Sequence, residues 1–64
     1  MREAELRSRL NRHLGLAYAG VWSDTVVLAD LAGRTVNEAL RDGVACKQVW
    51  RAVWLKLELP FHER

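Results

Sequence analysis

The sequence has one cysteine, Cys46, and one proline, Pro60, among its 64 residues. A lone cysteine can form no intrachain disulfide and no cysteine-rich metal site, which fits a reducing compartment better than secretion. Apolar runs are short, well below the roughly 18 residues that span a bilayer, and residues 2–13 alternate charges where a signal peptide would need an apolar core. We therefore expect a cytoplasmic protein with no targeting or membrane segment.

Positive charge is absent from the middle of the chain. Between residues 13 and 33 the acids Asp24 and Asp30 are accompanied by no lysine or arginine, whereas residues 34–56 carry five cations, and the net charge is +2. Four of these cations are candidate contacts for nucleic acid or for an acidic protein partner: Arg34, Arg41, Lys47 and Arg51. A solvated helix surface carries similar charges, so the basic half alone does not establish a nucleic-acid site.

Half of the residues are hydrophobic, which is enough for one small core. A chain of this length buries only about 60% of its unfolded surface on folding, so its stability is expected to be marginal. We predict a single helical domain over residues 1–64.

Hydrophobic periodicity predicts four helical segments. The first covers residues 3–14, with leucines at four-residue spacing, and Gly15 stops it. The second covers residues 17–32 and is apolar nearly all round, as expected for a helix in the middle of a bundle. Gly20 and the β-branched residues 25–27 weaken this second prediction. A buried strand there stays an alternative, because short apolar runs fit both patterns.

The third and fourth segments resemble a helix-turn-helix. Thr35 and Glu38 have the spacing of a capping box at the start of the third segment. Gly43 stands where a helix commonly ends with a left-handed residue, and the fourth segment then covers about residues 45–59. The pattern is typical of a binding module.

The apolar stripe of the fourth segment disagrees with that motif. At 100° per residue the stripe contains Cys46, Val49, Trp50, Val53, Trp54 and Leu57. The motif places Ala39, Gly43 and Val49 well, but its phase would turn both tryptophans toward a DNA groove, where indoles read base edges poorly.

Burial of a tryptophan outweighs a turn preference, so we predict that both tryptophans face inward. The predicted core consists of Leu6, Leu10, Leu14, Trp22, Leu28, Val49, Trp50, Val53, Trp54 and Leu57.

Several short stretches resemble one protein family over nearly the full length. They are Tyr18-Ala19, residues 31–36 (LAGRTV), residues 38–40 (EAL), Gly43-Val44, residues 49–52 (VWRA) and Leu59-Pro60. In these stretches the chain is similar to the small actinobacterial proteins grouped as domain of unknown function 3046. The resemblance implies a short helical protein with no assigned activity or ligand. That family usually has Asp-Pro where this chain has Ala45-Cys46, so a helix cap worth about 1 kcal/mol is missing here.

Residue types that support catalysis are few and scattered. His13 and His62 lie at opposite ends of the sequence with no carboxylate or cysteine at metal-ligand spacing. Cys46 beside Lys47 has one feature of a reactive thiol, but its place on the apolar stripe favours a small buried side chain. The glycines stand singly, so no phosphate-binding loop is present.

The sequence thus predicts an all-α bundle of three or four short helices with no enzymatic activity, cofactor or metal. An unidentified protein partner is the favoured ligand, and a homo-oligomer is compatible with it. The alternative is DNA binding through the third and fourth segments.

Overall fold

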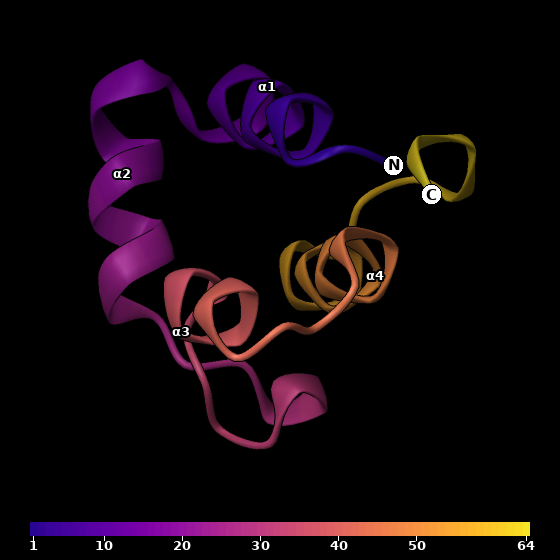
Figure 1. Cartoon of the computed structure of the whole chain (residues 1–64). Coiled ribbons are helices and arrows are strands. Elements are labelled where there is room, and N and C mark those ends of the chain that lie inside the picture. Colours follow the sequence, from indigo (N-terminus) through magenta and orange to yellow (C-terminus); the bar gives the residue numbers. More distant parts are fainter.

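A computed structural model describes residues 1–64 of the chain. It contains four α-helices and two short turns of 3₁₀ helix. The helices are α1 Glu3–Leu14, α2 Leu16–Thr25, α3 Val36–Arg41 and α4 Cys46–Leu57, and the 3₁₀ turns are η1 Ala29–Leu31 and η2 Phe61–Glu63. Helices α1 and α4 lie side by side and are seen nearly end-on in Figure 1, where α2 runs across them at one side. The predicted all-α fold is confirmed. No helix has both the length and the apolar character needed to cross a membrane.

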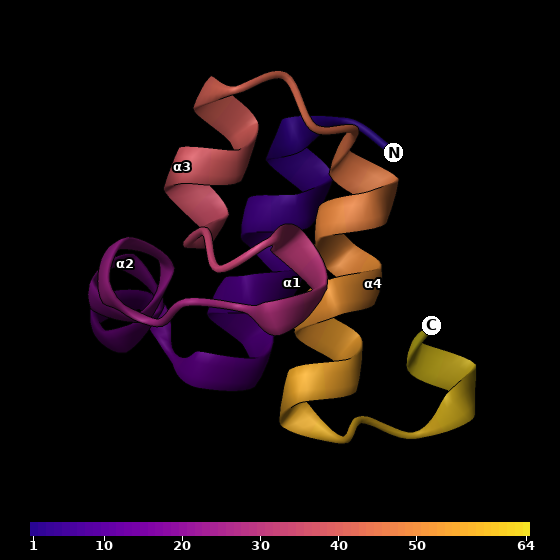
Figure 2. The ribbon, with the colours of Figure 1, turned by 90° about the horizontal axis from the view of Figure 1, so that it is seen from below.

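The first two helices meet at a single residue, Gly15. Its φ of +85° is unfavourable for residues with a Cβ, and its N–H donates to the carbonyl of Asn11 at 2.8 Å. Helix α2 begins at the very next residue, Leu16. The chain therefore turns sharply, which sets α2 across the aligned helices α1, α3 and α4 (Figure 2).

The prediction of one helix over residues 17–32 is wrong in its second half. Helix α2 ends at Thr25, whose hydroxyl donates to the carbonyl of Val21 at 2.7 Å. Residues 26–28 are extended, and the N–H of Leu28 donates to the carbonyl of Arg34 at 2.9 Å in an isolated antiparallel bridge. The β-branched run disfavours helix, and this bridge, with Leu28 fully buried, stabilises the extended alternative.

The predicted capping box begins the short helix α3. The Thr35 hydroxyl accepts from the N–H of Glu38 at 3.1 Å, and the Glu38 carboxylate accepts from the N–H of Thr35 at 2.9 Å. Gly43 follows the helix with a φ of +87°, as predicted. Helix α4 then starts after Ala45, which provides no side-chain hydrogen bond to the first turn.

Twelve buried hydrophobic residues form the core, and they come from all four helices, from η1 and from the extended residue that precedes η1. They are Leu6, Leu10, Ala19, Trp22, Leu28, Leu31, Val36, Ala39, Val49, Trp50, Ala52 and Val53. Seven belong to the predicted core. The other three predicted residues, Leu14, Trp54 and Leu57, are only half-buried, because they lie at the ends or edge of their helices.

Candidate interaction surfaces

Helix α4 presents a polar face near its N-terminus. Lys47, Gln48 and Arg51 are exposed and, with Ala45, line an open hollow of about 430 Å³. Neither cation takes part in the ion pairs of the structure. The fold thus brings together two of the four predicted contact residues on one surface.

The other two predicted contact residues lie outside this hollow. Arg34 pairs with Asp42 through a 3.1 Å contact between Nε and Oδ2, which ties the start of α3 to its end. Arg41 is exposed in the last turn of α3. Arg34 is thus the one predicted contact residue that has an ion-pair partner, and the other three, Arg41, Lys47 and Arg51, have none.

A C-terminal turn covers the two tryptophans of α4. The indole N–H of Trp50 donates to the backbone carbonyl of Glu63 at 3.0 Å, and that of Trp54 donates to the carbonyl of Pro60 at 2.8 Å. Phe61 packs edge-on against Trp54 with ring centroids 6.3 Å apart. Trp50 is consequently 1% exposed even though it stands at a position that a helix-turn-helix would present to DNA.

The Glu63 carboxylate anchors this turn to the end of α1. It accepts from Arg12 at 3.1 Å and from His13 Nε2 at 3.2 Å, and His62 Nε2 is 3.7 Å from its other oxygen. The two histidines that are far apart in the sequence therefore meet at one carboxylate. Local sequence patterns give no sign of this cluster, because Arg12 and His13 are about fifty residues from Glu63.

Charge determines the ionisation of Glu63. Desolvation raises the pKa of the carboxyl, but the hydrogen bond from His13 and the positive charge of Arg12 together outweigh it, with smaller contributions from the charges of His13 and His62. The pKa of Glu63 is therefore below its ordinary value of 4.5. The cluster holds a carboxylate anion rather than a neutral acid. The structure contains no group of three His, Cys, Asp or Glu side chains placed as metal ligands.

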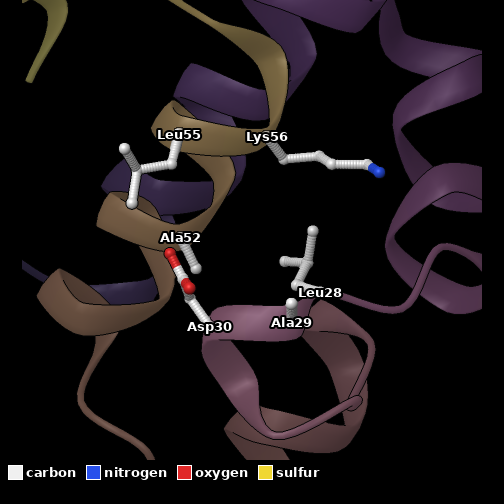
Figure 3. Close-up of a pocket in the computed structure, with 6 residues that line it drawn as sticks. All are labelled: Leu28, Ala29, Asp30, Ala52, Leu55 and Lys56. Carbon is white, nitrogen blue, oxygen red and sulfur yellow. The ribbon is translucent and has the colours of Figure 1, made fainter.

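A small groove separates η1 from α4 (Figure 3). Buried Leu28 and Ala52 form its floor, and Leu55, which is half exposed, forms one wall. Asp30 lies at one side with its carboxylate directed toward α4, while the Lys56 side chain extends away from it along the groove. The volume is about 160 Å³, comparable with a cavity that holds one benzene-sized group, so the groove suits a single side chain rather than a large ligand.

Helix α2 has an apolar side that no other element covers. Its buried residues are Ala19, Trp22 and Ser23. The side chains of Leu16, Tyr18 and Val21 are 78%, 56% and 57% exposed, and Val27, just beyond the helix, is 56% exposed. Four of the seven exposed large hydrophobic residues of the chain thus lie between residues 16 and 27.

Together these features define a small all-α protein whose surface offers shallow faces for contact. Residues 1–62 match the family described as protein of unknown function DUF3046, and the chain belongs to that family. No curated protein and no solved structure matches the chain.

Proposed function

We propose that this chain is a non-enzymatic binding module that docks on another protein through α2. The observation that carries the proposal is the uncovered apolar side of that helix, with Leu16, Tyr18 and Val21 each more than half exposed. Exposed apolar side chains gathered in one region mark interaction sites more often than scattered ones do. The region also lacks lysine and arginine, so apolar contact rather than charge would drive the association.

A binding role also agrees with the contacts of the cluster around Glu63, because its charged groups are engaged in holding the fold together. Glu63 is occupied by Arg12 and His13, and its backbone carbonyl accepts from Trp50. These groups hold the C-terminal turn on the core. Their polar atoms face one another, which supports a structural role for the cluster and no catalytic one.

Affinity capture from the native lysate tests the proposal, with and without nuclease and with three forms of the bait. The parent chain should retain a protein partner after nuclease treatment, whereas Val21→Asp should lose it because a carboxylate would enter the apolar contact. Leu55→Asp is the matched control, since Leu55 is exposed to a similar extent on α4. Loss on Leu55→Asp but not on Val21→Asp would reject the α2 surface.

DNA binding is the second candidate, and the polar face of α4 favours it. Lys47, Gln48 and Arg51 are side chains that contact phosphates and base edges. Against it, Trp54 and Trp50 take the groove-facing positions of a helix-turn-helix and are occupied by the C-terminal turn. DNA binding therefore requires that α4 contact DNA through its polar face and not through the face that a helix-turn-helix uses.

A further inference from the structure

Helix α2 carries an outward stripe suited to packing against another helix. At 100° per residue, the direction nearly opposite the buried side is occupied by residues at i, i+3, i+4 and i+7. These are Ala17, Gly20, Val21 and Asp24, all exposed. Leu16 and Tyr18 flank the stripe on its two sides, so apolar side chains continue beyond it.

Gly20, at the centre of the stripe, has no role inside the chain. The other three glycines have positive φ, and Gly20 does not. A Cβ at this position would meet no atom within 4 Å. Glycine inside a helix is destabilising relative to alanine, and one of its uses is close approach by another backbone. The space beside Gly20 is open to a partner. Gly20 also lines a hollow of about 240 Å³, together with Leu10 and Leu16 and with the polar side chains of Arg7 and Asn11.

The charge distribution favours a second copy as that partner. The chain has a net charge of +2, and no lysine or arginine lies between Arg12 and Arg34. Helix α4 carries Lys47, Arg51 and Lys56 and no acid, whereas Arg7 and Arg9 of α1 pair with Glu3 and Glu5. Two copies that met through α4 would bring like charges together, which is unfavourable at an interface. Helix α2 contains no cation, so two positively charged copies can meet there without that repulsion.

The two ends of α2 complement each other in an antiparallel pair. Its first turn contains no acid, and Gly15 supplies no side-chain cap, so the partial positive charge of the helix N-terminus is uncompensated. Asp24 lies near the other end, where its Oδ1 accepts a long hydrogen bond of 3.4 Å from Asn37 Nδ2 and its Oδ2 has no partner. A two-fold axis between Gly20 and Val21 places each Asp24 beside the first turn of the other α2, at Ala17, and both ends of the pair gain the same favourable contact.

We propose that two copies of this chain associate through α2 as an antiparallel two-fold pair centred on Gly20 and Val21. This inference rests on the proposed function, because it names the partner of the same surface. A standard interface takes about 800 Å² from each partner, roughly a fifth of the 4147 Å² surface of this chain. One ten-residue helix with its flanks supplies less, so we expect a weak pair whose population rises with concentration.

Sedimentation equilibrium of the full chain from low micromolar to millimolar concentration tests the pair. The parent should shift from monomer to dimer, and Val21→Asp should remain monomeric because two carboxylates would face each other across the axis. Circular dichroism of Val21→Asp should match the parent, since the side chain is exposed. Leu55→Asp is the matched control and should dimerise like the parent.

A cross-link gives an independent measurement. In a Cys46→Ser background, Gly20→Cys should form an interchain disulfide on mild oxidation, because the two positions face each other near the axis, within the Cα separation that a disulfide needs. Arg51→Cys in the same background should not. A parent that stays monomeric at millimolar concentration, or dimerises regardless of Val21→Asp, overturns the pair. The proposed function would survive the first result if capture of a different protein still required Val21.

Discussion

Trp50 is the residue on which most of the structure converges. Its indole is fully buried, its N–H donates to Glu63, and Arg9 and His13 pack against its ring at 5.3 and 6.0 Å. Contacts from α1 and from the C-terminal turn thus meet on one side chain of α4. Trp54, four residues later, has its hydrogen bond and its ring contact with the C-terminal turn and stays half-buried.

Replacement of the two tryptophans should therefore have unequal effects. Trp50→Ala should lower the free energy of unfolding by about 3–5 kcal/mol, the usual range for removal of a buried aromatic side chain. Trp54→Ala should cost clearly less, because part of its surface is already in water. Urea unfolding followed by circular dichroism measures both. Equal losses for the two variants would contradict the assignment of Trp50 as the central core residue.

The Glu63 cluster predicts a pH dependence of the C-terminal turn. Because the pKa of Glu63 is lowered in the folded chain, the ionised carboxylate stabilises the fold above its unfolded pKa of about 4.5, and this contribution is lost as the pH falls through the lower folded value. Glu63→Gln should therefore be less stable than the parent at neutral pH, and the difference should shrink below pH 4.5. Thermal unfolding of both forms across this range measures it.

His62→Ala is the control for that experiment. His62 is highly exposed and lies 3.7 Å from Glu63, farther than His13 and Arg12. Its removal should leave the pH dependence largely intact. A Glu63→Gln variant as stable as the parent at pH 7 would show that the ion pairs contribute nothing to the turn.

Helix boundaries were predictable where a local signal fixes them. Residues 3–14 form α1 as predicted, Thr35 and Glu38 form the capping box, and Gly43 has a positive φ. The segment from 26 to 34 was not predictable, because its conformation depends on the bridge from Leu28 to Arg34 and on burial in the assembled core. The hydrophobic periodicity of a short segment reports neither a long-range hydrogen bond nor burial by other elements.

The start of α4 lacks a side-chain cap. Ala45 occupies the N-cap position with extended backbone angles, which suit a capping side chain, yet makes no such hydrogen bond. Ala45→Asp should stabilise the fold by about 1 kcal/mol, because its carboxylate can accept from the first-turn N–H groups and is favoured by the helix dipole. Ala45→Asn can accept the same hydrogen bonds but has no charge, so comparison of the two variants separates the hydrogen-bond contribution from the helix-dipole contribution. No gain in chemical unfolding with either variant would show that water already satisfies this end.

At the scale of the whole molecule, the packing of the C-terminal turn against α4 could not be predicted from the sequence. Trp54 and Trp50 were correctly placed on the apolar side of α4, but the partner of each indole N–H comes from residues 60–63. The N–H of a buried indole usually has a hydrogen-bond acceptor. This requirement was the only indication in the sequence that another segment packs over the two tryptophans. The four predicted basic residues do not form one site. Lys47 and Arg51 lie on α4, Arg41 lies on α3, and Arg34 precedes α3 and pairs with Asp42.

Salt dependence separates the two candidate functions of the molecule. If DNA binds the polar face of α4, the slope of log affinity against log salt should be roughly −3 for three phosphate contacts, and Lys47→Ala with Arg51→Ala should flatten it by about 2. We expect no measurable binding to random duplex DNA at physiological salt, because few cations are free. Fluorescence anisotropy with labelled duplex measures this, and Arg34→Ala, which removes a paired cation, is the control. Tight binding with the steep slope would make DNA the better-supported ligand.

The missing cations of α2 also decide which chemical tools can detect it. Both lysines of the chain, Lys47 and Lys56, lie on α4, so amine-reactive cross-linkers have no lysine to modify on α2. Trypsin, which cleaves after lysine and arginine, leaves residues 13–34 as one uninterrupted peptide containing the entire helix. Lysine-directed cross-linking would therefore detect contacts of α4 but none of α2, even when a partner is bound to α2. Carboxylate labelling at Asp24 or photochemical labelling at Tyr18 would detect contacts of α2, and both residues lie in that single peptide.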